Sequence, residues 1–221
     1  MRPLTFALML LIALVSLAAM AAVAGWMGYG PFGGDRSRPV TASVSGNVLR
    51  IDQNYLRVAE QRNGGEQDHV DLVARFPDFL PARSVSAAGA IRDVDEARQV
   101  VVTLAAPDDV VDPADRPSKL YARFLSPDVW SHPGGLVMRR FEAGTPYDSE
   151  ELYLAPPEGR AFSARCMRPG HKPDGLPDSC IADFRMSGLD VRIRFQPDLL
   201  PEWQSLIEGV RGLVRSILVT P

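Results

Sequence analysis

Three patterns of apolar and polar residues divide this chain of 221 residues. Leu4 to Met27 carry no charge and are mostly apolar over 24 positions. The middle of the chain holds short apolar runs, many with a period of two, separated by turns rich in Gly and Pro. From Glu202 to Leu218, apolar residues recur every three or four positions. These patterns predict, in order, a membrane-spanning helix, a set of strands and a closing amphipathic helix.

The strand pattern is clearest at three places in the middle region. Val70–Phe76 and Leu189–Phe195 alternate between an apolar face and a mostly polar one, which is typical of a strand with one buried face. Gln99–Ala106 is a β-branched apolar run typical of a central strand. Shorter strands are predicted at residues 47–51, 55–59, 120–125, 136–141, 162–166 and 181–186.

The closing helix is predicted over Glu202–Leu218 and begins just after Pro201, at a position where a missing N–H costs nothing. Gly209 and Gly212 weaken it as an isolated helix but permit a close approach to a sheet. We expect its apolar stripe to pack on the sheet; the alternative is a helix lying on a membrane surface. The predicted fold class is therefore α+β, a mostly antiparallel β-sheet domain closed by a C-terminal amphipathic helix, plus one N-terminal transmembrane helix.

One strand-and-turn pattern recurs along the chain. Val70–Pro81 and Leu189–Pro201 both contain apolar-Asp-apolar, then Arg-Phe, then a Pro-Asp turn ending in Leu-Pro, and a shorter echo runs over 120–130. The recurrence suggests two pseudo-repeated halves, roughly 45–81 and 150–201.

The polar residues of this repeat form the candidate site. In both full copies Asp and Arg fall on the polar face of the strand, which predicts an interaction face built from Asp71, Arg75, Asp190 and Arg194. The alternative is that these side chains only make cross-strand pairs on a solvated face.

The apolar stretch Leu4–Met27 would measure about 36 Å as a helix, enough for a hydrocarbon core of about 30 Å. Trp26, Tyr29 and Phe32 follow in the manner of an interfacial aromatic belt. A cleaved signal peptide is the alternative, with Ala19–Ala21 as its cleavage signature, although apolar residues continue past that point. The predicted organisation is an anchor with a Gly-rich exit at 1–34, a linker at 35–46 and one domain at 47–221.

The two cysteines bear on the compartment, because the few charges beside the span do not orient it. Cys166 and Cys180 enclose 13 residues, among them three Pro and two Gly. A disulfide closing such a loop contributes about 3 kcal/mol, and paired cysteines are typical of an oxidising compartment. We therefore predict a disulfide and a periplasmic domain. The alternatives are two buried thiols in a cytosolic domain, or a metal site that includes His171 and lacks an evident fourth ligand.

Composition and motifs bound the chemistry. A net charge of −3 with mixed signs gives no nucleic-acid footprint. The sequence contains no Gly-rich phosphate loop, HExxH, GxSxG, SxxK or CxxC motif. No catalytic residue, cofactor or metal ligand is predicted, and the sequence leans against an enzyme. Trp130 to Pro133 form the corner where we expect an exposed aromatic-polar cluster, unless Trp130 simply packs under a turn.

Only two of the 24 basic residues are lysines, Lys119 and Lys172, a bias typical of a high-GC bacterial genome. The chain combines an N-terminal anchor, the Arg-Phe/Pro-Asp strands, the Cys166 and Cys180 pair and a PDLLPEW tail leading into a helix. In this order of features it resembles the uncharacterised single-pass envelope proteins of high-GC proteobacteria. The resemblance implies an inner-membrane protein with the bulk of the chain in the periplasm, and it implies nothing about mechanism.

The predicted function is a non-enzymatic interaction or assembly module of a cell-envelope complex, with the membrane and an envelope protein as its partners. One alternative is an envelope enzyme or ligand-binding domain whose site is assembled from distant residues. Another is a secreted soluble protein, if the N-terminal stretch is cleaved.

Overall fold

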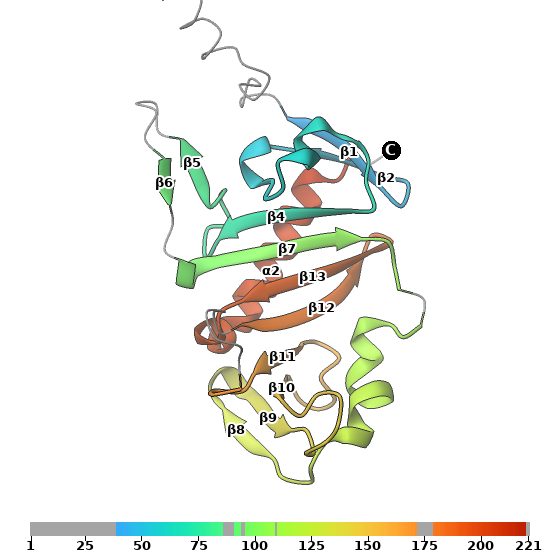
Figure 1. Cartoon of the computed structure of the whole chain (residues 1–221), viewed down its shortest axis with the longest axis vertical. Helices are drawn as coiled ribbons and strands as arrows, with labels where there is room; N and C mark the ends of the chain where they lie inside the picture. The colour runs from blue at the N-terminus through green and yellow to red at the C-terminus, as the bar shows by residue number, and fades with distance from the viewer. Residues whose placement is uncertain (1–38, 86–90, 94–95, 109, 172–178, 220–221) are drawn as a thin grey trace, which may run out of the picture. The chain divides into compact units, whose positions relative to one another are not determined.

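The computed structural model describes residues 39–85, 91–93, 96–108, 110–171 and 179–219. The predicted membrane span lies outside these ranges. Within them, no helix combines the length and the apolar character needed to cross a bilayer. The described part confirms the predicted α+β class, because a mostly antiparallel sheet carries the C-terminal helix on one face (Figure 1).

An eight-stranded antiparallel sheet forms the centre of the domain. Four strands of seven residues are followed in space by four shorter ones, and we call these groups the long-strand half and the short-strand half. The long-strand half is ordered β4 (His69–Arg75), β7 (Gln99–Ala105), β13 (Leu189–Phe195) and β12 (Cys180–Met186). The short-strand half continues with β11 (Ser163–Met167), β10 (Glu150–Leu154), β9 (Leu136–Arg140) and β8 (Trp130–His132).

Two smaller sheets complete the strands. The first contains the antiparallel hairpin of β1 (Val40–Val44) and β2 (Asn47–Ile51), with β3 (Gly65–Glu66) parallel to β1. The second pairs β5 (Arg83–Val85) with β6 (Ile91–Asp93). Strand β1 lies within the stretch 35–46 that we predicted to be a linker. Its small and polar composition hides an alternation in which every second residue is buried.

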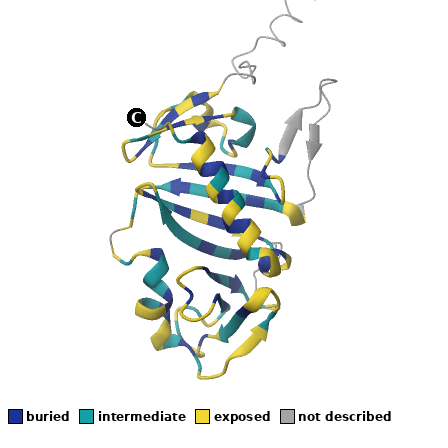
Figure 2. Cartoon of the chain, turned by 180° about the vertical axis from the view of Figure 1, so that it is seen from behind, coloured by how far each residue is buried: buried dark blue, intermediate teal, exposed yellow. Residues whose placement is uncertain are grey.

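Helix α2 (Trp203–Ile217) covers one face of the long-strand half, as Figures 1 and 2 show from opposite sides. The prediction of a core-packing helix is confirmed, with each end within one residue. Its buried stripe joins the main hydrophobic core and consists of Leu206, Ile207, Val210, Leu213, Val214 and Ile217.

The short-strand half is covered on its other face. The helical turns η4 (Pro113–Asp115), η5 (Pro117–Tyr121) and η6 (Ala122–Phe124) lead into a second core cluster that contains Leu152. Leu152 pairs across the strands with Arg165, then Ile181, then Arg194, so it shares a sheet face with Arg194. The neighbours of Arg194 in β13 are buried on the α2 side. The two core clusters therefore lie on opposite faces of the sheet.

Two predicted strands are wrong. Residues 120–125 form η5 and η6, because the apolar residues Leu120, Tyr121, Phe124 and Leu125 have the spacing of one helical face. Residues 55–59 follow the turn η1 (Gln53–Tyr55) and contribute only one isolated bridge to β4. The remaining turns are η2 (Glu60–Asn63), η3 (Glu96–Arg98), η7 (Pro133–Gly135) and η8 (Pro197–Glu202).

The predicted repeat is seen in the strand of each copy, whereas the segments that follow differ: residues 76–78 form a turn and Pro197–Glu202 form η8. The two copies become β4 and β13, which lie on either side of β7 and are both antiparallel to it. Beyond these strands the predicted halves differ, because β2 and β4 belong to separate sheets whereas β10 to β13 form a meander.

Candidate functional site

The candidate site is the face of the long-strand half that is turned away from α2, which we call the open face. Cross-strand partners in an antiparallel sheet point to the same side, so the register defines this face. One row of partners runs across β4, β7, β13 and β12 as Asp71, Thr103, Arg192 and Asp183. The flanking rows are His69, Ala105, Asp190 and Arg185 on one side and Val73, Val101, Arg194 and Ile181 on the other.

The register places all four predicted interaction residues on the open face. Asp71 and Arg75 come from β4, and Asp190 and Arg194 come from β13. They reach one side because each strand alternates, and the apolar residues between them are buried toward α2. That they bind a partner stays a prediction.

Three of these four side chains already have partners within the chain. Asp71 accepts a hydrogen bond from the Thr103 hydroxyl at 2.6 Å and lies 3.8 Å from the His69 imidazole. Arg75 donates to the carboxylate of Asp78 in the turn after β4, and this hydrogen bond holds the pKa of Asp78 below its usual value. These contacts are internal pairs, as the alternative expects for a solvated face, and they leave the binding of a partner a prediction.

Asp190 accepts more hydrogen bonds than Asp71, the other carboxylate among the four predicted residues. Partial burial acts to raise its pKa, but a hydrogen bond from Arg185 Nε at 2.6 Å and one from the Asp108 backbone N–H at 2.8 Å outweigh that effect. The net result is a pKa below the usual value, so Asp190 is an ionised, fixed acceptor at neutral pH.

A third carboxylate anchors the β12 side of the open face. Asp183 accepts from Arg192 Nε and from Arg116 Nη1, both at 2.8 Å. Arg116 follows the turn η4, and its side chain is only 13% exposed. This pair of contacts fixes Arg192 and links the open face to the turns that cover the short-strand half.

A cleft of about 140 Å³ opens in the middle of this face. Two short side chains of β7, Val101 and Thr103, lie among longer side chains contributed by β4, β13 and the segment after η1. Its lining residues are Arg57, Asp71, Val101, Thr103, Arg192 and Arg194. The backbone N–H of Arg57 donates to the Asp71 carbonyl at 2.9 Å, which brings Arg57 beside β4.

Sequence reasoning missed two arginines of this cleft. Arg192 lies between Asp190 and Arg194 on the same outward face, so the alternation of β13 already pointed to it. The repeat concealed it, because the equivalent position of β4 is Val73. Arg57 had no local signal, since its place depends on a contact with a strand whose residues come later in the chain.

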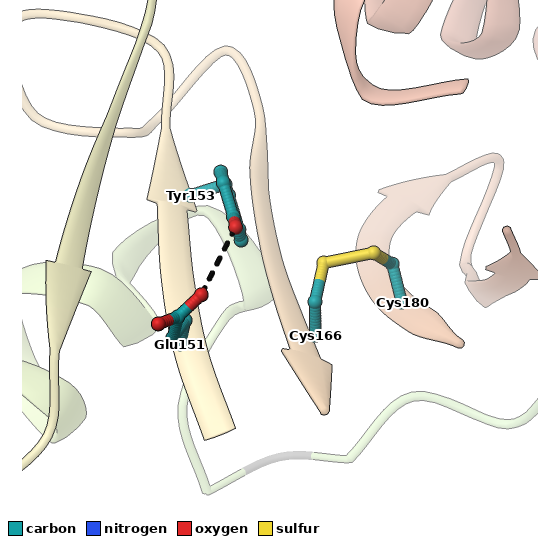
Figure 3. The surroundings of a disulfide bond; sticks show 4 residues. All are labelled: Glu151, Tyr153, Cys166 and Cys180. Atoms are coloured by element: carbon teal, nitrogen blue, oxygen red, sulfur yellow. Dashed lines mark hydrogen bonds between the residues drawn. A yellow bond between two sulfur atoms is a disulfide. The ribbon is translucent and has the colours of Figure 1, made fainter. Parts of the chain in front are cut away.

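The disulfide is the second feature predicted from the sequence, and the structure joins Cys166 of β11 to Cys180 of β12 (Figure 3). Both cysteines are buried. The bond takes up both thiols, so the alternatives of free thiols and of a metal site with His171 do not apply. In the described part of the chain, no group of three His, Cys, Asp or Glu side chains is arranged to hold a metal ion.

Glu151 lies beside the disulfide, opposite Cys166 in the register of β10 and β11 (Figure 3). It is 8% exposed and accepts hydrogen bonds from Arg140 Nε at 3.2 Å and from the Tyr153 hydroxyl at 3.1 Å. Burial, and then the charge and hydrogen bond of Glu151, raise the pKa of Tyr153 to about 12. These are satisfied polar contacts that stabilise the sheet.

The predicted aromatic-polar corner is present at the sheet edge. Trp130, in the edge strand β8, is 36% exposed, and the Arg140 guanidinium lies 4.9 Å from its ring centroid. His132 packs edge-on against Tyr153, with 4.9 Å between ring centroids. The register places Trp130 and Tyr153 on the same side of the sheet as α2, so this corner is separate from the open face.

The fold and the open face define a class of protein: an α+β domain whose central sheet leaves a charged face uncovered. No known family model matches the sequence, and no curated protein matches it. Two solved structures are similar. An immunity protein of the Stenotrophomonas maltophilia type IV secretion system matches with a TM-score of 0.59 and 17% identity, over 83% of this chain and 94% of that one. The iron-regulated outer membrane lipoprotein FrpD of Neisseria meningitidis matches with a TM-score of 0.44 and 11% identity, over 82% and 93%. At 17% identity, the likeness to the immunity protein shows a shared fold.

Proposed function

We propose that this chain is a non-enzymatic, protein-binding module of the bacterial cell envelope, and that its partner docks on the open face. The observation that carries the proposal is a charged face of the four longest strands that lies opposite α2. The segment after η1 and the turn η4 border this face, and the cleft opens in its middle. That face presents charged side chains held in fixed positions rather than an apolar patch. Such a surface is suited to a water-soluble partner recognised through complementary charge.

The internal ion pairs of the open face support binding because they fix its shape in advance. Asp71, Asp183 and Asp190 are each held by hydrogen bonds from within the chain. Immobilising a mobile side chain at an interface usually costs about 0.5–1.5 kcal/mol. Side chains that are already ordered avoid most of this cost when a partner binds. The same pairs that stabilise the domain therefore prepare it for a partner.

The dimensions of the clefts favour a protein partner over a small-molecule substrate. Two clefts in the described part of the chain measure about 140 Å³ on the open face and about 150 Å³ between β12 and α2. Pockets that enclose small-molecule ligands usually measure about 300–1,000 Å³. The alternative of an envelope enzyme or ligand-binding domain therefore has less support than a binding module.

The fold supports the same kind of role. The match to the immunity protein extends over 94% of that protein's chain, so nearly all of it has this fold. We propose for this chain a role in which binding to another protein is the function and no reaction is catalysed.

We also propose that the described domain lies in the periplasm, tethered to the inner membrane by Leu4–Met27. The Cys166–Cys180 disulfide supports an oxidising compartment. Mass spectrometry of the mature N-terminus tests the tether: a chain that begins near Ala22 would show that the stretch is cleaved.

Site-specific photo-crosslinking in the native host tests the docking face. A photoreactive residue at Ala105, on the open face beside the cleft, is compared with one at Glu208, on the exposed side of α2. We expect one defined protein to be crosslinked from Ala105 and not from Glu208. The purified pair should then bind in a 1:1 assay that charge reversal at the exposed Arg194 weakens. Equal crosslinking from both positions, or none from Ala105, would refute the proposal.

A further inference from the structure

We infer that the cleft over β7 is a carboxylate-recognition site that receives an aspartate or glutamate side chain of the partner protein. This inference rests on the proposed function, because it names what the partner contributes at the open face. It rests on three observations: the shape of the cleft, the balance of charges around it, and two arginines whose guanidinium groups have no acceptor among the residues that the structure describes.

The shape follows from the lengths of the side chains on three adjacent strands. Neighbouring strands lie about 4.8 Å apart, so β4 and β13 stand roughly 10 Å from each other on either side of β7. Strand β7 presents the short side chains of Val101 and Thr103, while Asp71, Arg192 and Arg194 rise beside them. The result is a trough of about 140 Å³, wide enough for one inserted side chain.

The charges around the trough favour an anion. Three arginines and one aspartate line it. The aspartate, Asp71, is engaged by Thr103 and His69, and Arg192 donates through Nε to Asp183. Among the described residues, Arg57 and Arg194 have no carboxylate within 4.0 Å and no side-chain hydrogen bond.

The guanidinium groups of Arg57 and Arg194 are therefore available to a ligand. A guanidinium presents parallel N–H donors that match the two oxygens of a carboxylate, and such charge-assisted pairs are stronger than neutral hydrogen bonds. The arginines come from different segments, β13 and the stretch after η1, so an inserted carboxylate would bridge them across the trough.

The occupant is a carboxylate rather than a phosphate because of the rest of the lining. Asp71 keeps one negative charge in the wall, which repels a doubly charged group more than a singly charged one. The Val101 side chain on the floor offers an apolar contact for the methylene groups of Asp or Glu. A side chain of an acidic segment satisfies both features.

A titration with defined peptides tests the inference without knowledge of the partner. The probes are N-acetylated, C-amidated hexaglutamate and hexaglutamine, added at low salt to full-length chain with ¹⁵N-labelled arginine. We expect hexaglutamate, and not hexaglutamine, to shift the Nε–H signals of Arg57, Arg192 and Arg194. Each of Arg57→Gln and Arg194→Gln should weaken the peptide about threefold, and the double variant about tenfold, as expected for exposed ion pairs.

Arg215→Gln is the matched control, because Arg215 is an exposed arginine on α2, away from the open face. It should bind hexaglutamate as the unchanged chain does, and circular dichroism should show that every variant is folded. Equal weakening by Arg215→Gln, or peptide shifts spread over all exposed arginines, would show non-specific attraction and overturn the inference. Tighter binding of inorganic phosphate than of hexaglutamate would overturn it in favour of a phosphate site.

The peptide titration and the crosslinking experiment can fail independently, so the carboxylate site and the docking face are tested separately. A partner crosslinked from Ala105 together with no specific peptide shift would refute the carboxylate site and leave the docking face standing. A specific peptide shift without any crosslinked partner would refute the docking face while the carboxylate chemistry of the cleft remained.

Discussion

We expect Gly209→Ala to destabilise the domain and Gly212→Ala to stabilise it, although both glycines lie in α2. In a helix interior, alanine is favoured over glycine by about 1 kcal/mol, so propensity alone predicts the same gain at both positions. The surroundings differ. A Cβ at Gly212 meets nothing within 4 Å, whereas a Cβ at Gly209 would lie 1.8 Å from Phe79 Cε2 and within 2.4 Å of two further ring atoms.

The cost at Gly209 follows from how little Phe79 can move. Carbon atoms in contact prefer about 3.5–4.0 Å, so the ring must retreat by well over 1 Å. Phe79 is 9% exposed, meets Phe76 edge-to-face with 5.8 Å between centroids, and has its carbonyl held by the Tyr55 hydroxyl at 3.0 Å. Overpacking of this kind costs about 1–3 kcal/mol, and somewhat more when the ring cannot retreat. A contact as close as 1.8 Å belongs to the upper part of this range, about 3 kcal/mol, so after the helix gain of about 1 kcal/mol is subtracted we expect Gly209→Ala to lower the unfolding free energy by about 2 kcal/mol.

Urea unfolding of the full-length chain, followed by far-UV circular dichroism, measures both changes. Gly212→Ala should raise the unfolding free energy by about 0.5–1 kcal/mol. Adding Phe79→Leu to Gly209→Ala should recover part of the loss, because the shorter side chain makes room for the new methyl group. If both alanine variants were stabilising by the same amount, the packing of Phe79 against α2 would be refuted.

Three further predictions follow from particular contacts. Replacing both Cys166 and Cys180 with Ser should lower the unfolding free energy by about 2–4 kcal/mol in urea, and a reductant should have the same effect on the unchanged chain but none on the variant. The phenol of Tyr153 has a pKa of about 12 against a usual value of 10, so its contribution to stability is complete below pH 10 and is lost as the pH rises through about 12. An absorbance titration should lose a transition near pH 12 in Tyr153→Phe. The pKa of Asp190 is lowered, so its contribution to stability is present above about pH 3.8 and is lost as the pH falls further. Asp190→Asn should therefore lower the thermal midpoint at pH 7, and the difference from the unchanged chain should shrink toward pH 3.

The elements predicted correctly are those whose pattern is local. The stripe of α2 and the alternation of β4 and β13 are each visible within about seven to fifteen residues, and the structure has them within a residue of the predicted ends. Residues 120–125 were misassigned because a short, mostly apolar segment fits a strand as well as a helical face. These residues form the helical turns η5 and η6 because their apolar side chains pack into the second core cluster, which forms only when distant strands meet.

The candidate site likewise has a part that local sequence patterns predict and a part that depends on distant strands. Asp71, Arg75, Asp190 and Arg194 share a face because strand alternation is a local property, and the sequence predicted it. The cleft depends on which strand lies between β4 and β13 and on how long its side chains are. That information lies in the pairing with β7, whose short residues Val101 and Thr103 carry no signal of their own.

The position of the disulfide gives it a role beyond the loop that it closes. The core cluster against α2 and the cluster around Leu152 lie on opposite faces of the sheet, and the change of face falls near the junction of β11 and β12. Only three residue pairs join β11 to β12, against seven between β12 and β13. The bond between Cys166 and Cys180 lies at the end of this short junction. It therefore reinforces the junction between the strands of the open face and the strands that lead to the Trp130 corner, in addition to the hydrogen bonds that pair β11 with β12.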